Sequence, residues 1–439
     1  MKPLYSLFII IALTVSCKKD VEIPKTDALP IQLTDAFGMA VPHLDHSRDI
    51  DILTRYEMGV RWVRRDIAWD RVERTKDQFD FSQDDDVIDR EIKQGIQILG
   101  ILDYGNTIYN TSPEATTAYP PDTLAYFCNF VKHTVLHFKD RIKVWEIWNE
   151  PNGPTFWKPS ANPKAYGELA LLAAKCIKET DPSAKVMLGG MVGNSDPVFF
   201  GLRPWGFTED LFNYYPELSS VIDIYAVHPY TFLQHPIPEA PTSNPLHTGF
   251  IDMLKNFRQV IDRAGGHDKP IWITEMGWHS AIHSTIFDGV PEDMQAANLV
   301  RASVLAISMG IEKIFPYTYV DGFEDLSVSE AHFGMMRPIP NAGPSQAYIP
   351  KPAYYAYKTL TKILSDKKSV IDLHTIRKLQ PYIYAYQFDN IIVAWTIDED
   401  SHLLSLEQKP KSILNLYGEN IVVENENIAI SKLPIFIEL

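Results

Sequence analysis

The sequence predicts an α/β protein in which eight strand-and-helix units close into a (β/α)8 TIM barrel, followed by a small C-terminal β-sandwich-like domain. Short apolar runs of strand length recur eight times between residues 37 and 320. Amphipathic stretches with apolar residues at spacings of three and four separate these runs, as expected of helices that cover a sheet. Eight even units over roughly 330 residues favour a closed barrel over an open doubly wound sheet.

The eight barrel strands are expected at residues 37–42, 59–67, 96–105, 142–150, 184–191, 221–230, 270–278 and 311–320. The first strand is not followed by a glycine-rich nucleotide fingerprint, and LGGMVG at 188–193 lacks the lysine of a phosphate-binding loop. A tightly packed strand end is the simpler interpretation of this segment. The barrel is expected over 31–366 and the β domain over 367–439, with the strand-like run 31–33 a candidate to join the β domain.

The N-terminus predicts export. One lysine precedes an apolar run from Leu4 to Val15 that is short for a bilayer span, so residues 1–16 are interpreted as a signal peptide. Its end, LTVSC, resembles a bacterial lipobox, which would make Cys17 the lipidated first residue and 17–30 a tether. An ordinary secretory signal is the alternative. The expected location is the bacterial outer membrane, on its periplasmic side or at the cell surface, with the protein anchored by lipid.

Composition limits the partners. Acidic residues outnumber basic ones by 56 to 41, a formal net charge of -15, which disfavours binding to nucleic acid or to anionic membrane. Beyond Cys17 the chain has two cysteines, Cys128 and Cys176, too few for a disulfide scaffold. Buried thiols are the favoured interpretation, with a single disulfide as the alternative.

Two glutamates close barrel strands, Glu150 in IWNE and Glu275 in ITEM. Active sites in such barrels lie at the C-terminal ends of the strands, so the two carboxylates should face each other across the mouth. Paired carboxylates are the groups that glycoside hydrolysis needs, with retention at a separation of about 5 to 5.5 Å and inversion at a wider one. At the shorter distance, repulsion of about 3 kcal/mol would raise one pKa from about 4.3 toward about 6.5.

These motifs resemble those of the retaining glycoside hydrolases of clan A. WNEP and TEMGW are similar to the clan's acid/base and nucleophile motifs. The sequences of residues 59–73, 79–106 and 144–190 resemble family 39, especially its polysaccharide-cleaving bacterial members. The resemblance covers about residues 37–366 and implies a barrel fold. It also implies that Glu150 is the general acid/base and Glu275 the nucleophile.

The resemblance assigns further residues to the site. Asn149 would contact the hydroxyl beside the reacting carbon, and His228 and Tyr230 would line the cleft and orient the nucleophile. Arg64 corresponds best to the arginine near the nucleophile, with the adjacent Arg65 as the alternative. Glu146, four residues before Glu150, is interpreted as a core carboxylate paired with an arginine.

Aromatic residues near the strand ends are candidate sugar platforms, because the CH faces of sugars pack on flat rings. Trp157 and Trp278 are preferred since they follow the two glutamates, and Tyr104, Asn106 and Tyr317 are further candidates.

Two histidines, His279 and His283, have the spacing of metal ligands on a helix, but solvent-facing loop residues are the favoured interpretation. We therefore expect no metal and no organic cofactor.

The predicted function is a lipid-anchored retaining glycosidase that cuts a poly- or oligosaccharide. The alternatives are an exo-acting β-xylosidase-like enzyme and a catalytically silent carbohydrate-binding lipoprotein. The sugar, the linkage, the choice between internal and terminal cleavage, and the oligomeric state do not follow from the sequence.

Overall fold

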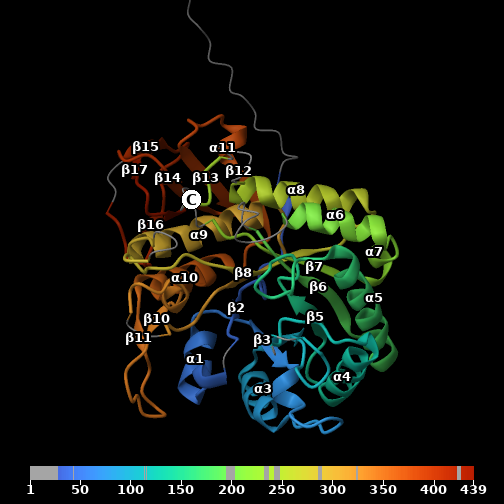
Figure 1. Ribbon diagram of the computed structural model, residues 1–439. Helices are drawn as coiled ribbons and strands as arrows, with labels where there is room; N and C mark the ends of the chain where they lie inside the picture. The colour runs from blue at the N-terminus through green and yellow to red at the C-terminus, as the bar shows by residue number, and fades with distance from the viewer. Residues whose placement is uncertain are drawn as a thin grey trace, which may run out of the picture.

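The computed structural model describes residues 28–42, 44–112, 114, 116–193, 203–231, 237–241, 248–284, 289–322, 325–422 and 427–439. The predicted signal peptide, the lipidation site Cys17 and most of the predicted tether lie outside these residues. Across the described ranges, none of the helices combines the length and apolar character needed to span a bilayer. The chain forms a barrel wrapped in helices, with a smaller β domain beside it (Figure 1).

The barrel contains eight strands, each paired in parallel with the next in chain order. Two isolated parallel bridges, Phe37–Ile314 and Ala40–Tyr317, join the first strand to the last and close the barrel. All eight predicted strands and the closed barrel are confirmed. The strands are β2 Gly38–Ala40, β3 Trp62–Ala68, β4 Gln97–Asp103, β5 Val144–Asn149, β6 Lys185–Val192, β7 Ile224–His228, β8 Ile271–Met276 and β9 Lys313–Pro316.

Helices surround the barrel (Figure 1). The longer ones are α1 Asp49–Glu57, α3 Ser82–Gln94, α4 Leu124–His137, α5 Pro163–Thr180, α6 Pro204–Tyr214, α8 Phe250–Arg263, α9 Glu292–Ser308 and α10 Pro352–Leu364. Shorter elements are α2 Trp69–Val72, α7 Leu218–Val221, α11 Leu373–Ile376, the 3-10 turns η1 Leu44–His46 and η2 Ser329–His332, and the paired strands β10 Met336–Arg337 and β11 Ile349–Pro350.

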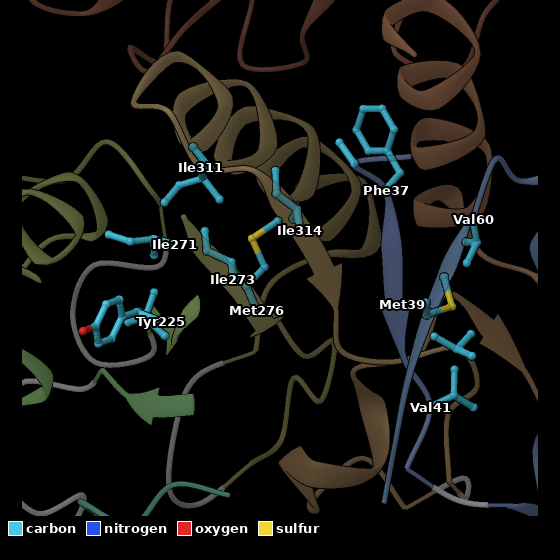
Figure 2. Packing of buried hydrophobic residues seen from close by; sticks show 14 of the residues in the cluster. Phe37, Met39, Val41, Val60, Tyr225, Ile271, Ile273, Met276, Ile311 and Ile314 are labelled. Carbon is cyan, nitrogen blue, oxygen red and sulfur yellow. The ribbon is translucent and has the colours of Figure 1, made fainter. Parts of the chain in front are cut away.

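Alternate residues along each barrel strand serve two different cores. One set packs against the surrounding helices, as Figure 2 shows for Ile271 and Ile273 of β8 and Ile314 of β9. The other set points into the barrel and fills it near the start of the strands, with Trp62, Leu99, Val144, Met187, Ile224, Ala226, Trp272 and Phe315. The side chains that follow on the same inward face must therefore lie nearer the mouth.

The C-terminal domain is a six-stranded antiparallel sheet in the order β1-β12-β13-β14-β18-β16, with a separate β15–β17 ribbon that shares an apolar cluster with it. The strands are β12 Ser369–Asp372, β13 Ile383–Phe388, β14 Ile391–Thr396, β15 His402–Ser405, β16 Ser412–Leu414, β17 Asn427–Ile430 and β18 Ile435–Glu438. An N-terminal strand, β1 Leu29–Pro30, pairs with β12. This pairing lies two residues earlier than the run 31–33 that the sequence indicated.

The barrel and the β domain are joined by a buried polar contact. The indole nitrogen of Trp395 on β14 donates a 2.7 Å hydrogen bond to Glu239, whose carboxylate also forms an ion pair with Arg301 of α9 at 2.5 Å. All three side chains are buried. A carboxylate that bonds both a barrel helix and the sheet holds the two domains in one orientation.

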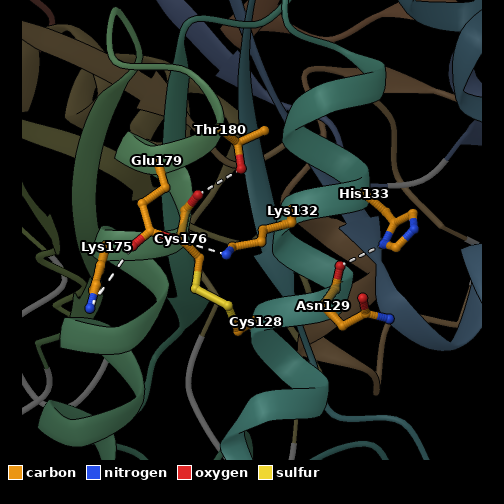
Figure 3. The surroundings of a disulfide bond; sticks show 8 residues. All are labelled: Cys128, Asn129, Lys132, His133, Lys175, Cys176, Glu179 and Thr180. Atoms are coloured by element: carbon orange, nitrogen blue, oxygen red, sulfur yellow. Dashed lines mark hydrogen bonds and ion pairs between the residues drawn. A yellow bond between two sulfur atoms is a disulfide. The ribbon is translucent and has the colours of Figure 1, made fainter.

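Cys128 and Cys176 form a disulfide between α4 and α5, with their Cα atoms 5.9 Å apart (Figure 3). The preferred prediction of two buried thiols is therefore wrong, and the alternative is correct. Figure 3 also shows Lys132 of α4 reaching Glu179 of α5, at 2.9 Å. The bridge thus fastens the two helices that follow β4 and β5.

Candidate functional site

The two predicted glutamates lie together at the mouth of the barrel. Glu275 is the fifth residue of β8, and Glu150 directly follows β5. One carboxylate oxygen of each, with a ring nitrogen of His228, lies within 4.8 Å of the others. Glu150 has φ of 46° and Trp148 has φ of 67°, both in the left-handed region that non-glycine residues seldom adopt. This backbone departs from a regular strand where Glu150 must turn into the mouth.

Glu275 is held by two donors. The Tyr230 hydroxyl donates to its Oε2 at 2.9 Å, and the Arg64 guanidinium donates to its Oε1. The adjacent Arg65 points the other way and bonds Glu91 of α3 at 2.7 Å. Of the two arginines considered from the sequence, the structure therefore places Arg64 in the site.

Arg64 also organises the residues beneath the glutamates. Its guanidinium donates to both oxygens of Glu146, at 2.7 and 3.0 Å, and to the amide oxygen of Asn149 at 2.8 Å. Glu146 is fully buried and also accepts from the backbone NH of Gly190 at 2.7 Å. Glu146 is therefore the structural partner of an arginine that the sequence predicted.

His228 contacts Glu150 more closely than Glu275. Its Nδ1 lies 2.8 Å from Glu150 Oε1 and 3.9 Å from Glu275 Oε2, and its Nε2 lies 2.9 Å from the Thr274 hydroxyl. The expectation that His228 orients the nucleophile is not what the geometry favours, because its direct partner is the other glutamate. Thr274, which sequence reasoning missed, fixes the ring from the far side.

Gly190 makes room for this histidine. A Cβ atom added at Gly190 would lie 2.1 Å from His228 Nε2, closer than any real contact. The glycine-rich end of the fifth predicted strand is therefore a close-packing site, as the sequence indicated, and the residue that packs there, His228, belongs to the candidate site.

The two glutamates have different surroundings, which shift their pKa values by different amounts. Burial raises the pKa of Glu150 well above its ordinary value, and the charge of Glu275 raises it further. Burial also raises the pKa of Glu275, to about 7, while Arg64 and the Tyr230 hydroxyl lower it. Because both donors point at Glu275, we assign the anion to Glu275 and the proton to Glu150. Repulsion between the two carboxylates, the cause expected from the sequence, raises the pKa of Glu150 less than burial does.

His228 is neutral in this setting. Burial lowers the pKa of its ring well below the ordinary value, and the charge of Arg64 lowers it further. A neutral ring can accept a hydrogen bond from, or donate one to, the Glu150 carboxyl at 2.8 Å. His228 can therefore hydrogen-bond Glu150 in either of its protonation states.

Asn149 is fixed at both ends of its amide. Its oxygen accepts from Arg64, and its nitrogen donates to the Tyr104 hydroxyl at 2.9 Å. The second hydrogen on that nitrogen is available to an incoming hydroxyl. Asn149 and Tyr104 thus stand beside the glutamate pair, as predicted.

The predicted aromatic platforms are placed differently. Trp157 is 2% exposed and packs on Trp148 and Tyr166, and Trp278 is 3% exposed. Neither ring presents a free face, so the prediction that they are platforms is wrong for this structure. Phe156, which was not singled out, is half-buried and stacks on Tyr104 with ring centroids 5.5 Å apart.

Two other candidates, Tyr317 and Asn106, also differ in where they lie. Tyr317 is half-buried and donates to Glu330 at 2.6 Å, so it borders the site. Asn106 is buried and donates to the backbone oxygens of Trp69 and Glu73, at 3.4 and 2.9 Å. It therefore fixes a loop and does not face the mouth, which corrects the prediction.

The prediction that His279 and His283 face solvent is wrong for His279 and agrees with the structure for His283. His279 is buried and packs edge-on against Phe333, with centroids 5.4 Å apart, while His283 is exposed.

The residues that could hold a metal ion are the same as the catalytic candidates. Among the described residues, Glu150, His228 and Glu275 form a three-donor group. Both oxygens of Glu275 already accept hydrogen bonds from Arg64 and Tyr230. A cation would compete with that guanidinium, so the donor set fits proton transfer better than metal binding.

Comparison with known families matches residues 37–303 to the family described as Cellulase (glycosyl hydrolase family 5). The match covers more than half of the chain and includes both glutamates. The chain is also similar to the β-xylosidase of Geobacillus stearothermophilus, with 25% identity over 267 residues, which cover 56% of this chain and 48% of that protein. The chain thus spans about half the length of this curated relative.

Two solved structures have the same fold. A family 39 glycoside hydrolase from the gut symbiont Bacteroides cellulosilyticus WH2 has a TM-score of 0.71 at 20% identity, over 92% of this chain and 80% of that one. A monomeric β-xylosidase from Caulobacter crescentus CB15 has a TM-score of 0.65 at 16% identity, over 94% and 97%. At these identities the likeness concerns the fold alone.

Proposed function

Because the chain belongs to the cellulase family, glycosyl hydrolase family 5, and is an O-glycosyl hydrolase, we propose that it cleaves poly- or oligosaccharides with retention of anomeric configuration. Glu275 is the nucleophile and Glu150 the general acid/base. The observation that carries this proposal is the spacing of the pair, with oxygens within 4.8 Å. This close approach fits the shorter carboxyl separation, about 5 to 5.5 Å, at which one carboxylate attacks the sugar directly, better than the about 6.5 to 9.5 Å of a pair that activates a water between them.

In the first step, Glu275 attacks the anomeric carbon while the bond to the leaving oxygen breaks. The Glu150 proton passes to that oxygen, so the leaving group departs as a neutral alcohol and the sugar becomes an ester of Glu275. In the second step, Glu150 takes a proton from water, whose oxygen displaces Glu275 from the sugar. Both carboxyls then return to their starting states.

The surrounding residues support each change of charge. When Glu150 loses its proton, the neutral His228 can donate its Nδ1 hydrogen to the new carboxylate at 2.8 Å. When Glu275 becomes an ester, Arg64 keeps its bonds to Glu146 and Asn149. The ion pair below the site therefore remains neutral through the cycle, and the geometry of Asn149 is retained for the next hydroxyl.

An exo-acting, β-xylosidase-like enzyme is the second candidate, favoured by the similarity to proteins named β-xylosidase. Product size distinguishes it from an internal cutter: oligosaccharides from a polymer indicate internal cleavage, and monosaccharide alone indicates terminal cleavage. A catalytically silent sugar-binding protein would release neither product.

We also propose that the protein is exported and anchored by lipid at Cys17 on the bacterial outer membrane. The short apolar run before that cysteine supports this, and so does the Cys128–Cys176 disulfide, since disulfides persist in oxidising compartments. Cys17→Ser should release the protein into the soluble fraction. Unchanged partitioning into membranes would disprove the anchor.

The central test uses Glu275→Gln, which keeps the shape of the side chain and removes its charge. This variant should lose hydrolysis and still bind oligosaccharide in calorimetry, whereas a normal rate would exclude Glu275 as nucleophile. NMR of the wild-type product during early turnover tests retention. First release of the anomer opposite to that of the substrate would exclude the two-step mechanism.

A further inference from the structure

Lys351 is a buried lysine that the proposed mechanism does not use. It directly precedes α10, and its side chain is fully buried. Its ammonium donates to both carboxylate oxygens of Asp321, at 3.2 and 3.1 Å, and to the Ser280 hydroxyl at 3.0 Å. Both partners are buried as well. Because the removal of two charges from water is costly, the contacts of this ammonium must offset a large penalty.

The two partners of Lys351 belong to different loops at the barrel mouth. Ser280 lies in the loop after β8, five residues beyond Glu275. Asp321 lies in the loop after β9, four residues beyond Tyr317. Loops that follow the strands of such a barrel border its active site. Lys351 therefore joins the loop that follows the proposed nucleophile to the loop that follows Tyr317.

The loop after β9 is bonded to Lys351 at three consecutive residues or their side-chain partners. The Gly334 NH donates to Asp321 Oδ1 at 2.8 Å. The backbone NH of Lys351 donates to the backbone oxygen of Met335 at 2.9 Å. Phe333 directly precedes these two residues, so its backbone is held in place from the side of the ion pair.

The loop after β8 holds the same segment from the other side. The Ser280 NH donates to the backbone oxygen of His332 at 3.0 Å. The amide nitrogen of Gln295, a buried residue of α9, donates to the backbone oxygens of Trp278 and Phe333, at 2.8 and 3.3 Å. The position of Phe333 thus depends on both loops that Lys351 joins.

The ring of Phe333 packs against two tyrosines of the site. It meets Tyr230 with ring centroids 6.0 Å apart and Tyr317 with centroids 5.6 Å apart. Val192 belongs to the same apolar cluster. The Tyr230 hydroxyl donates to Glu275 Oε2 at 2.9 Å. A close-packed interior transmits displacements, so a shift of Phe333 would move the ring that carries this hydroxyl.

Burial opposes both charges of the ion pair. It lowers the pKa of Lys351 and raises that of Asp321, while each partner stabilises the charge of the other. His332 Nδ1 lies 3.9 Å from Asp321 Oδ2, and Glu292 and Arg337, which bond each other, also act on Lys351. Loss of the ammonium would therefore weaken the hold on Asp321 and on the loop after β9.

We propose that Lys351 is a positioning residue, which holds Phe333 against Tyr230 and thereby keeps the Tyr230 hydroxyl on Glu275. The inference rests on the proposed role of Glu275 as nucleophile and gives a role in the reaction to a buried cation outside the glutamate pair. The connection runs through the loop after β9, and each step in it is a hydrogen bond, a peptide bond or a ring contact.

Lys351→Met tests the proposal, because methionine is similar in length and has no charge. A Tyr230 hydroxyl that is held less firmly stabilises the Glu275 anion less. The acidic limb of kcat/KM against pH should then move up by about 0.5 to 1 unit, part of the about one to two units expected when a hydrogen bond to a charged group is lost. An acidic limb that stays fixed or moves down would overturn the proposal and leave the glycosidase function intact. A wild type that cleaves no glycoside would remove both.

A double variant shows whether the effect passes through Tyr230. In the Tyr230→Phe background the hydroxyl is absent, so adding Lys351→Met should not move the acidic limb further. An equal shift in both backgrounds would mean that the two residues act independently, which would refute the proposed route.

Lys313→Met is the matched control. Lys313 is also a buried lysine, pairs with Asp35 at 3.0 Å and begins β9, at the end of the barrel opposite the mouth. This variant should lower Tm and leave the acidic limb in place, and a shift equal to that of Lys351→Met would refute the assignment. If Lys351→Met does not fold, Asp321→Asn/Lys351→Met removes both charges and keeps an acceptor for the Gly334 NH. The acidic limb of that variant should also move up, and a fixed limb would overturn the proposal.

Discussion

Tyr230→Phe tests how Glu275, the proposed nucleophile, is kept ionised. The change removes one hydroxyl, which donates a 2.9 Å hydrogen bond to Glu275 Oε2, and preserves the ring. The hydrogen bond stabilises the ionised form of Glu275 more than its protonated form, because Oε2 carries more negative charge in the carboxylate than in the carboxylic acid. Its loss must therefore raise the pKa of Glu275.

The structure sets the size of the effect. A hydrogen bond to a charged group contributes about 1.5 to 3 kcal/mol, and about 1.36 kcal/mol corresponds to one pKa unit. The pKa of Glu275 should then rise from about 7 by about one to two units. Since Glu275 acts as an anion, the acidic limb of the activity profile should move to higher pH. At a pH below both values, kcat/KM should fall about 10- to 100-fold.

The assay is kcat/KM against pH for the aryl glycoside that the wild type cleaves fastest. Tyr319→Phe is the matched control, because Tyr319 is also buried and its hydroxyl faces Asp51 at 3.5 Å instead of Glu275. The control should leave the acidic limb in place. An acidic limb in Tyr230→Phe that stays fixed, or moves to lower pH, would refute this account of Glu275.

Three further predictions follow from single contacts. Glu150→Ala should slow the cleavage of substrates with poor leaving groups by about 10²- to 10⁴-fold, but should leave the first step unchanged for a dinitrophenyl glycoside, whose leaving group needs no proton. Added azide should then give a glycosyl azide of retained configuration, detected by NMR. An azide of inverted configuration would contradict the two-step mechanism. Cys128→Ser should lower the free energy of unfolding in urea by about 4 kcal/mol, from a closed loop of 48 residues, with wild-type protein under reductant as the comparison. Gly190→Ala should displace His228 and lower activity at least tenfold, whereas Gly206→Ala, with open space around its Cβ, should not.

Much of the architecture could be predicted because strand rhythm and strand ends are local properties. The eight strands lie where the apolar runs indicated, and the recognition of a clan A glycoside hydrolase was correct, as the family match shows. Once the strand ends were known, the fold brought Glu150 and Glu275 together across 125 positions of sequence. The pairing of Arg64 with Glu146 followed from the same reasoning.

The errors concern residues whose place depends on loops and on neighbouring helices. Trp157 lies seven positions after Glu150, but the turn after β5 folds back and packs its ring under Trp148. The disulfide requires α4 and α5 to lie side by side with two Cα atoms 5.9 Å apart, which helical periodicity cannot indicate. Periodicity predicts that a helix forms and which face it buries, but not which helix lies opposite.

The chemistry of the pair depends on an arginine that is already neutralised. Arg64 alone would hold Glu275 as a stable anion with a low pKa, and such a carboxylate attacks carbon poorly. Glu146 occupies the other side of the same guanidinium, and its charge raises the pKa of Glu275. The three groups together carry one negative charge, so Glu275 is ionised near neutrality yet remains reactive. Glu146 therefore has a role beyond pairing a buried cation: it sets how strongly Arg64 stabilises the anion of Glu275, the proposed nucleophile.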